Sequence, residues 1–356
     1  MYVLRPLLRQ ETKFFFRLIA KNNLEENEMK KIKTLKIILA FLIVLSACGG
    51  EKAGELGTGK EMGKKKIGIV QFIEHPSLDL AREGFEEGLK KLGIDCDIDY
   101  KSAQGNIDTA KTICEKFASD RVDLIYAIAT PAAQMAKAAT GEIPIIFAAV
   151  TDPVSAELVS SNDKPGANIT GVSDAVNVKL QLELFSQLDA DIKNIGVIYS
   201  ADEANSIEQV NKVKKASRDF GLNIFEKSIQ NLSDLPQTVT SLAKKVDAIY
   251  IPSDNKISNS ISLLAETLVR EKIPSICTTR GDIEGGMLLT MGIDYKNQGA
   301  KASELAKKVL VDKINPGQLP VTLSEKLDKL YNLKTARDLG LDENKDVFKD
   351  AIDVTK

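Results

Sequence analysis

The segment from Lys66 to Gly93 reads KIGIVQFIEHPSLDLAREGFEEGLKKLG, and it decides the fold because a strand pattern and a helix pattern follow each other within it. The run 67–72 is almost entirely apolar, as expected of a strand that is covered on both faces of a sheet. Apolar side chains then recur at helical spacing, at Leu78, Ala81, Phe85, Leu89 and Leu92. Gly93 can adopt the left-handed backbone that ends many helices. The segment therefore predicts one βα unit.

The same alternation continues along the chain. Further strands are predicted at 95–100, 124–129, 145–150, 169–172, 195–199, 222–226, 247–251 and 275–277. Amphipathic segments separate them, including helices expected from Pro131 and from Pro153. Strands separated by helices form parallel sheets with helices on both faces. The fold class expected is α/β, with doubly wound parallel sheets.

A turn-rich break at 162–166 divides the series into two. We expect a first lobe of 66–172 plus about 294–318, and a second lobe of 173–293 plus about 319–345. The strand-like pieces 286–293 and 320–323 flank a helix at 297–311, which suits connections that cross between lobes. Hinge crossings of this kind predict a cleft protein whose two lobes can close.

The charge of the chain argues against nucleic acid as a partner. The 356 residues include 48 Lys and Arg against 50 Asp and Glu, and the signs are interspersed. A protein that neutralises a phosphate backbone needs a basic stripe, which this sequence lacks. With 43% hydrophobic residues, the chain is long enough for two globular lobes.

The N-terminal part has the pattern of a secretory signal. The apolar run 37–47 is too short for the roughly 20 residues that span a membrane as a helix. Met29 opens a basic segment ahead of this run, so 29–47 is expected to be a signal peptide. Residues 1–28 place acidic side chains before the signal and fit no signal pattern. Translation is therefore expected to start at Met29, with residues 1–28 an over-extended reading of the gene.

The end of this signal, Leu45-Ser46-Ala47-Cys48, resembles the lipobox of bacterial lipoproteins. The resemblance implies that Cys48 is diacylated and becomes the mature N-terminus. The alternative, a buried Cys after a core helix, suits poorly the Gly, Glu and Lys that follow. Residues 48–65 are then a lipidated tether. The expected location is the extracytoplasmic face of the cell membrane.

Candidate ligand-binding residues follow the strands, because open α/β sheets bind ligands beyond the carboxyl ends of their strands. Three such loops carry a polar cap or a Pro: Thr130-Pro131-Ala132-Ala133-Gln134, Thr151-Asp152-Pro153 and Pro252-Ser253-Asp254-Asn255. Helix starts of this type expose N–H groups that could seat a ligand carboxylate. Asp254 could accept a ligand ammonium group. The alternative is that these residues only cap helices.

The loop after the first strand adds Phe72, Glu74, His75 and Ser77 as candidates. His75 is the one His of the chain and has no Cys or His at ligand spacing, so no metal site is expected. The rings of Phe72, His75, Phe147 and Tyr199 could enclose an apolar side chain of the ligand. Aromatic residues at strand ends can equally belong to the core.

The sequence argues against an enzyme, and no cofactor is expected. Gly54 to Lys60 match the start of a P-loop, but Glu61 replaces the Ser or Thr that holds Mg²⁺, and no strand precedes them. No Gly-x-Ser-x-Gly elbow occurs. Besides Cys48, the chain has Cys96, Cys114 and Cys277. Cys96 and Cys114 are expected to be small buried hydrophobic residues, although a disulfide remains open.

Several segments, in their order along the chain, resemble the ABC-transporter substrate-binding proteins of the tryptophan/tyrosine-binding type. They are Ile73-Glu74-His75-Pro76-Ser77-Leu78-Asp79, Ala129-Thr130-Pro131-Ala132-Ala133-Gln134, Ala149-Val150-Thr151-Asp152-Pro153-Val154, Asn168-Ile169-Thr170-Gly171-Val172-Ser173, Pro252-Ser253-Asp254-Asn255 and Gly292-Ile293-Asp294-Tyr295. The resemblance implies a periplasmic-binding-protein type I fold. It also implies a monomer that binds a free aromatic amino acid between closing lobes and delivers it to an ABC permease.

Other functions stay open at this stage. The chain has no Trp and 5% aromatic residues, so a branched apolar amino acid or another small solute could be the ligand. A lipid-anchored receptor that signals without transport would differ only in its partner. A regulator of the lac-repressor type would need a DNA-binding segment where the lipobox-like sequence stands.

Overall fold

The computed structural model describes residues 64–324 and 327–356, and two β-sheets with their helices make up this part of the chain. The expected signal peptide, the expected lipidation site Cys48 and most of the expected tether lie outside the described residues. Within those residues, no helix is both long and apolar enough to cross a membrane.

The first sheet is parallel throughout, in the order β11-β5-β4-β3-β1-β2. Its strands are β1 (Lys65–Gln71), β2 (Cys96–Ser102), β3 (Leu124–Ile128), β4 (Ile145–Val150), β5 (Ile169–Ser173) and β11 (Thr322–Leu323). The strands predicted in this part of the chain are confirmed, with small shifts at their ends. β3 and β4 are fully buried, as their continuous apolar runs require.

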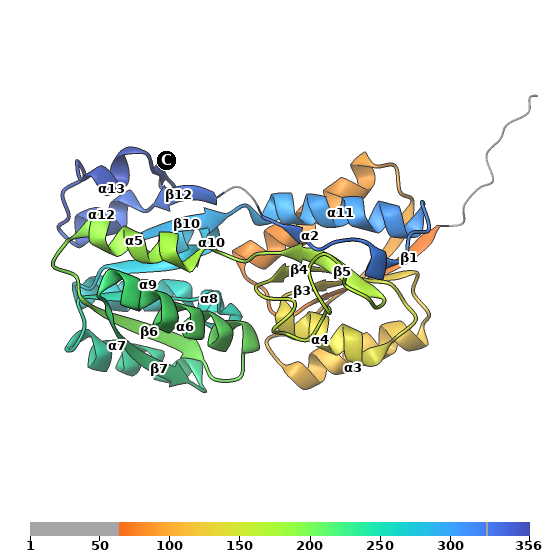
Figure 1. Cartoon of the computed structure of the whole chain (residues 1–356), viewed down its shortest axis with the longest axis horizontal. Coiled ribbons are helices and arrows are strands. Elements are labelled where there is room, and N and C mark those ends of the chain that lie inside the picture. The colour runs from red at the N-terminus through yellow and green to blue at the C-terminus, as the bar shows by residue number, and fades with distance from the viewer. Residues whose placement is uncertain (1–63, 325–326) are drawn as a thin grey trace, which may run out of the picture. The chain divides into compact units, whose positions relative to one another are not determined.

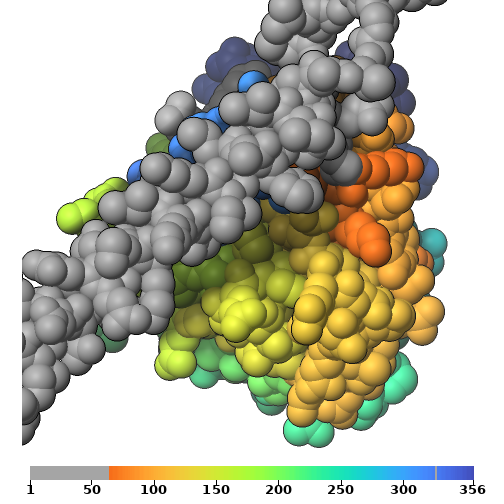
Figure 2. All heavy atoms as spheres, turned by 90° about the vertical axis from the view of Figure 1, so that its right-hand side faces the viewer, coloured from red at the N-terminus to blue at the C-terminus, as the bar shows by residue number. Residues whose placement is uncertain are grey.

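Helices cover both faces of the first sheet. α2 (Pro76–Lys91) and α11 (Tyr295–Leu310) lie side by side on one face, and α3 (Ile107–Ser119) and α4 (Thr130–Ala139) cover the other (Figure 1). α2 and α11 approach so closely that a Cβ on Gly84 would collide with the carbonyl oxygen of Lys296. Seen from its outer end, this lobe shows mainly early segments of the chain, in orange and yellow (Figure 2).

The second sheet has the order β13-β12-β10-β9-β8-β6-β7. Its strands are β6 (Asn194–Ser200), β7 (Asn223–Ile229), β8 (Ala248–Tyr250), β9 (Ser275–Thr279), β10 (Leu289–Ile293), β12 (Leu327–Tyr331) and β13 (Ile352–Asp353). β12 is antiparallel to β10, whereas the other pairs are parallel. Both sheets therefore contain a doubly wound unit in which the second strand lies at the edge, and the predicted fold class is confirmed.

The helices of the second lobe divide between its two faces. One core contains α5 (Val178–Leu188), α6 (Ala204–Ala216) and the short α12 (Leu333–Asp338) and α13 (Asp346–Lys349). The other core contains α7 (Leu235–Ala243), α8 (Asn255–Asn259), α9 (Ile261–Arg270) and α10 (Arg280–Glu284). Short 3-10 helices η1 (Ser217–Phe220), η2 (Leu232–Asp234) and η3 (Pro316–Gln318) complete the described elements.

In the described part of the chain, three crossings join the sheets: after β5, after β10 and after β11. The tail differs from the expected lobe boundaries. We expected 319–323 in the second lobe, but β11 pairs with β5 of the first sheet. The second lobe also continues past residue 345, because α13 packs on α5 and β13 pairs with β12.

The helix expected from Pro153 does not form. The backbone N–H of Ala156 bonds to the Asp152 carbonyl, and that of Leu158 to the Pro153 carbonyl, which makes a series of turns. Glu157 then has a φ of 58°, which stops helical propagation because left-handed backbone cannot continue a right-handed helix. Pro153 thus begins a series of turns, and the helix that its position predicted is absent.

Cys96, Cys114 and Cys277 are all free thiols. Cys114 is fully buried among apolar side chains, as predicted, and so is Cys277. Cys96 lies on the edge strand β2 and is only partly buried, so the prediction of a buried residue is wrong there.

Candidate ligand-binding site

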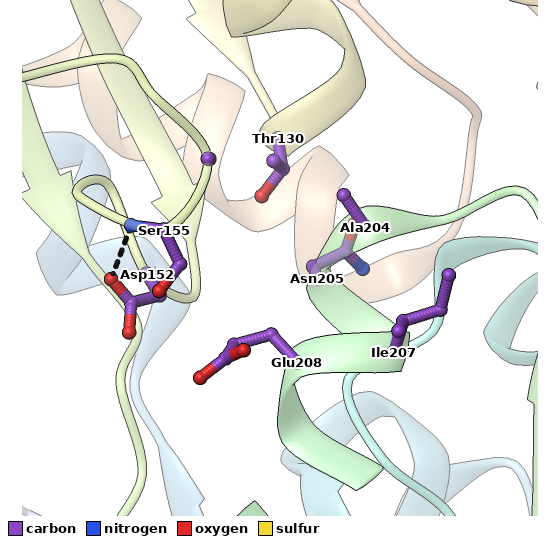
Figure 3. Close-up of a pocket in the computed structure, with 8 residues that line it drawn as sticks. Thr130, Asp152, Ser155, Ala204, Asn205, Ile207 and Glu208 are labelled. Atoms are coloured by element: carbon purple, nitrogen blue, oxygen red, sulfur yellow. Dashed lines mark hydrogen bonds between the residues drawn. The ribbon is translucent and has the colours of Figure 1, made fainter. Parts of the chain in front are cut away.

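Residues at the carboxyl ends of strands from both sheets enclose two neighbouring cavities. The larger has a volume of about 180 Å³. Its lining comes from Thr130, Asp152, Ser155 and Ala156 of the first lobe and from Ala204, Asn205, Ile207 and Glu208 of the second. Figure 3 shows Thr130 and Asp152 facing the side chains of α6 across this space. The sequence placed Thr130 and Asp152 in the site but missed the contribution of α6.

The smaller cavity has a volume of about 10 Å³, which is close to the least that can hold one water molecule. Its lining comes from His75, Leu78, Ala149, Thr151, Asp174 and Tyr295 on the first-lobe side, and from Asn205, Ser253, Asp254, Asn255, Ser258 and Thr279 of the second lobe. Asn205 borders both cavities, so they adjoin. The structure thus brings together five residues that the sequence singled out: His75, Thr151, Ser253, Asp254 and Asn255.

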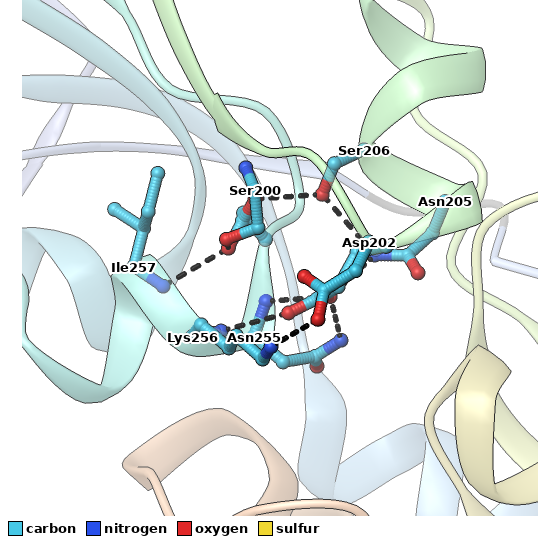
Figure 4. A network of polar contacts seen from close by, with 9 residues as sticks. Ser200, Asp202, Asn205, Ser206, Asn255, Lys256 and Ile257 are labelled. Atoms are coloured by element: carbon cyan, nitrogen blue, oxygen red, sulfur yellow. Dashed lines mark hydrogen bonds and ion pairs between the residues drawn. The ribbon is translucent and has the colours of Figure 1, made fainter. Parts of the chain in front are cut away.

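Asp254 is a helix cap whose carboxyl group is fully used within the described chain. Its Oδ1 accepts hydrogen bonds from the Ser200 hydroxyl (2.8 Å) and the Ile257 N–H (2.9 Å). Its Oδ2 accepts from the Ser200 N–H (2.6 Å) and the Ser206 hydroxyl (2.9 Å). Figure 4 shows two of these donor residues, Ser200 and Ser206, on neighbouring elements. Two carboxylate oxygens offer about four acceptor positions, and all are occupied. The structure thus shows the alternative, a helix cap. The pairing of Asp254 with a ligand ammonium stays a prediction, and it would require one of these hydrogen bonds to be exchanged.

A second buried carboxylate, Glu203, lies next to Asp254 and was missed by the sequence analysis. It accepts hydrogen bonds from the Asn205 side chain and from the N–H groups of Asn255 and Lys256. Burial and the negative charge of Asp254 raise the pKa of Glu203. These donors join the start of α8 to the start of α6 and leave Glu203 little capacity for a ligand.

Asp174 and Tyr295 form a buried pair at the crossings between the lobes. Asp174 directly follows β5, and Tyr295 is the first residue of α11 after β10. The Tyr295 hydroxyl donates to Asp174 Oδ2 at 2.7 Å. Asp174 Oδ1 is buried and has no hydrogen-bond partner among the described residues. Burial raises the pKa of the Asp174 carboxyl group, and the hydroxyls of Tyr295 and Thr151 oppose this rise.

His75 stands at the N-cap position of α2 and faces the second lobe. His75 is 7% exposed, and its Nε2 has no hydrogen-bond partner in the described structure. Burial lowers the pKa of His75 to about 4, although the Asn255 side chain opposes the shift, so His75 is neutral at physiological pH. A neutral imidazole donates one hydrogen bond from one ring nitrogen and accepts one at the other. The unpaired Nε2 therefore suits a polar ligand group.

The loop after β3 is arranged partly as predicted. α4 begins at Thr130, and the Thr130 hydroxyl is buried without a partner among the described residues. Ala129 before it has a φ of 81°, a left-handed backbone that is unusual for a residue with a Cβ. Ala132 and Ala133 are fully buried and line neither cavity, and Gln134 donates to the Ala156 carbonyl.

The remaining predicted residues lie away from the cavities. Phe72 is buried in the core of the first lobe, and so is Phe147, whereas Tyr199 packs against one core of the second lobe. Glu74 is exposed and accepts from the Tyr100 hydroxyl. Ser77 is buried in α2 beside Gly281 of the second lobe. Phe72, Phe147 and Tyr199 therefore belong to or pack against the core, which was the alternative left open for aromatic residues at strand ends.

Contacts between the lobes hold the cavities closed. Lys212 of α6 pairs with Asp152 of the first lobe at 2.5 Å. The Asn259 side chain of α8 donates to the Glu74 carbonyl at 2.7 Å. At Gly281 the lobes touch so closely that a Cβ would lie 2.7 Å from Ser77 Oγ. Among the described residues, no group of His, Cys, Asp and Glu side chains is arranged to hold a metal ion.

Comparisons with known proteins place the chain among binding proteins. The family model described as ABC transporter substrate binding protein matches residues 66–355. The tyrosine-binding protein of Clostridioides difficile (strain R20291) is 39% identical over 88% of this chain and 94% of its own length.

Two solved structures, one with a ligand and one without, allow the shape of this chain to be compared with a ligand complex and with an open form. An ABC domain from Streptococcus pneumonia in complex with L-Trp is 34% identical, with a TM-score of 0.78 over 81% of this chain and 98% of that one. A ligand-free, open substrate-binding protein with adhesive properties from Clostridium difficile is 39% identical, with a TM-score of 0.64 over 82% of this chain and 99% of that one. The described structure is thus closer in shape to the ligand complex, although its sequence is closer to the open protein.

Proposed function

Because the chain belongs to the family of ABC transporter substrate-binding proteins and is not an enzyme, we propose that it captures a free amino acid, with aromatic amino acids favoured. The ligand would bind in the cleft between the two lobes and be delivered to a membrane permease. The resemblance of residues 45–48 to a lipobox supports a further part of this proposal: Cys48 carries lipid and holds the protein, as a monomer, on the extracytoplasmic face.

The charge of the cleft is the observation that carries the proposal. Four acidic residues are buried at or beside it: Asp174, Glu203, Asp254 and Asp282. In the described part of the chain, no Lys or Arg is buried. Asp254 and Glu203 are hydrogen-bonded at both oxygens, whereas Asp174 has an unpaired buried oxygen in the described structure. An ionised, incompletely hydrogen-bonded carboxylate without a cationic partner is unfavourable, and a ligand with an ammonium group would compensate the charge of Asp174. A free amino acid carries such a group.

The two cavities suit the other parts of an amino acid. The larger one has the apolar side chains of Ala156, Ala204 and Ile207 for the ligand side chain. Thr130 at the start of α4 offers an unpaired hydroxyl, at the positive end of a helix dipole, for the carboxylate. The similarity in shape to the L-Trp complex supports a closed state in which the ligand is enclosed. Binding from solution requires the lobes to open first.

Binding measurements test the proposal directly. The mature protein, purified under denaturing conditions and refolded to remove bound ligand, is titrated calorimetrically with each of the proteinogenic L-amino acids. We expect at least one aromatic amino acid to bind with a dissociation constant in the micromolar range or below. If no amino acid binds to the refolded, monodisperse protein, the proposal is wrong.

The lipid anchor needs a separate measurement. We expect the full-length protein expressed in a bacterial host to partition with membranes and to carry a diacylglyceryl mass on Cys48. The Cys48→Ser variant should appear without this mass and leave the membrane fraction. A wild-type protein without any acyl mass would contradict the anchor and leave the amino-acid site untouched.

A branched apolar amino acid is the second candidate ligand. The rings that border the cavities belong to His75 and Tyr295, and the apolar part of the larger cavity's lining is aliphatic: Ala156, Ala204 and Ile207. The same titrations distinguish the two ligand classes, since tighter binding of leucine or isoleucine than of tryptophan or tyrosine would favour this candidate.

A further inference from the structure

Among the buried carboxylates of the cleft, Asp174 differs in having an unused oxygen that borders a cavity. Asp254 and Glu203 accept hydrogen bonds at both of their oxygens. Asp282 also has an unpaired oxygen, but Asp282 does not line either cavity described above. Asp174 is 3% exposed, lines the smaller cavity and leaves Oδ1 without a partner in the described structure.

The position of Asp174 in the chain is also distinct. It is the first residue of the crossing that follows β5. Its hydrogen-bond partner Tyr295 follows the second crossing, after β10. The pair therefore ties two of the connections about which the lobes must rotate, and the unpaired oxygen lies between the lobes.

A neighbouring side chain strengthens this link to the crossings. Gln298 of α11 is buried, and its Oε1 accepts from the N–H of Ala149, which lines the same cavity. The Gln298 Nε2 donates to the Ser324 hydroxyl at 2.9 Å, beside the third crossing, and to the Ser173 carbonyl at 3.5 Å. The cavity wall and the crossings are thus held by one hydrogen-bonded group of residues on α11.

We infer that Asp174 accepts a hydrogen bond from the α-ammonium group of the ligand. Tyr295 holds the carboxyl group of Asp174 in place for this contact. The inference rests on the proposed function, because it assigns one contact within the amino-acid site. The ammonium would donate to Oδ1 while the Tyr295 hydroxyl occupies Oδ2. Ligands without an amino group would leave the carboxylate buried and unpaired, so they should be rejected.

Paired ligands make this inference testable. The probes are L-tryptophan with indole-3-propionic acid, and L-tyrosine with 3-(4-hydroxyphenyl)propionic acid, which differ within each pair by the amino group alone. We expect the wild-type protein to bind its preferred amino acid at least 100-fold more tightly than the des-amino partner. Asp174→Asn should weaken binding of that amino acid by about 30- to 1000-fold and change binding of the des-amino acid little.

Two further variants complete the experiment. Tyr295→Phe keeps the Asp174 carboxyl group but removes the hydrogen bond that orients it. We therefore expect a loss of affinity of about tenfold that is again confined to the amino acid. Asp202→Asn makes the same chemical change as Asp174→Asn at a carboxylate that pairs with Lys256 on the surface, and its affinities should equal those of the wild type. Thermal unfolding of each variant shows whether it is folded. In Asp174→Asn the side-chain amide oxygen can still accept the hydrogen bond from the Tyr295 hydroxyl.

The possible outcomes separate the inference from the function. Wild-type binding of an amino acid, with unchanged affinity in Asp174→Asn, would overturn the inference and leave the proposed function intact. Equal losses for the amino acid and its des-amino partner would also overturn it, because the contact would then not be with the ammonium. A wild-type protein that binds none of the proteinogenic amino acids would overturn both. If an amino acid other than tryptophan or tyrosine binds, that amino acid and its des-amino partner replace the two pairs.

Discussion

Asp174 and Asp254 border the same small cavity, yet their surroundings give them different roles. Asp254 receives donors from β6, α6 and the first turn of α8, so its charge is balanced within the protein. Asp174 accepts a hydrogen bond from Tyr295 at Oδ2, the nearby Thr151 hydroxyl also favours its ionised form, and Oδ1 has no hydrogen-bond partner in the described structure. A buried carboxylate that accepts hydrogen bonds at both oxygens stabilises its lobe. One that accepts hydrogen bonds at a single oxygen leaves the other available to a ligand.

The same substitution at the two sites should separate these roles most clearly. Asp254→Asn places an amide NH₂ against donors that need an acceptor, and we expect the free energy of unfolding to fall by about 2–4 kcal/mol. Asp174→Asn keeps the acceptor for Tyr295 and removes a buried charge, so the change should stay within about 1 kcal/mol. Urea denaturation followed by circular dichroism measures both. Equal destabilisation by the two variants would contradict the comparison.

The pH dependence of binding should follow Asp174. Its pKa is raised by burial in the ligand-free protein, and a ligand ammonium needs the ionised form. As the pH falls through this raised pKa, Asp174 takes up a proton while the ligand stays cationic, so affinity should fall by up to about tenfold per pH unit.

Other titrating groups near Asp174 call for a control. Tyr295 stays neutral because burial raises its pKa, His75 is neutral above its pKa of about 4, and burial raises the pKa of Asp282 to about 6. Calorimetry between pH 4.5 and 8 on wild type and Asp174→Asn separates them. A slope that persists in Asp174→Asn would assign the effect to another group. Asp282 and Glu203, whose pKa burial raises to about 8, would be the first to examine.

Closure of the lobes can be disturbed without touching either carboxylate. In Gly281→Ala the new methyl group would meet Ser77 and Pro76 across the cleft, so the closed state becomes less favourable. We expect ligand affinity to fall by about tenfold, with the free energy of unfolding of the ligand-free protein nearly unchanged. Gly141→Ala is the matched control, because its Cβ would meet nothing within 4 Å. An unchanged affinity in Gly281→Ala would show that closure tolerates this contact.

The smallest effect is expected from the ion pair between Lys212 and Asp152. Both side chains are partly exposed, at 41% and 23%, and such pairs contribute about 0.2–1 kcal/mol. Lys212→Gln should therefore reduce ligand affinity by less than about fivefold, and high salt should produce a similar loss in the wild type. Lys214→Gln removes an ion pair within the second lobe, to Glu226, and should leave affinity unchanged. A larger loss than fivefold would mean that this contact governs closure.

Most of the fold could be predicted from the sequence because burial on both sides of a parallel sheet leaves continuous apolar runs. The runs at β3 and β4 are examples, and Gly93 ends a helical segment with positive φ as predicted. α5 was missed, although Val178, Leu182 and Phe185 follow helical spacing and are buried. β12 was missed because only one of its residues is fully buried, which leaves little hydrophobic pattern.

The site was predicted less well, for a geometric reason. The rule that ligands bind at strand ends identified Thr130, Thr151 and Asp254, and it applies equally to Asp174 directly after β5. A strand-end position does not tell how many donors surround a carboxylate. The donors of Asp254 come from Ser200 and Ser206, more than 45 residues away in sequence, so only the folded structure distinguishes the two roles.

The packing of α11 against α2 bears on how the chain acquires its structure during synthesis. Residues of α2 face α11 through close backbone contacts at Gly84 and Gly299, and the ribosome makes α11 only after most of the second sheet. N-terminal segments usually fold first during translation, but here the first lobe lacks one of its covering helices until late. A nascent chain of this order stays incompletely folded for most of its translation, which is the condition that transport through a narrow export channel requires.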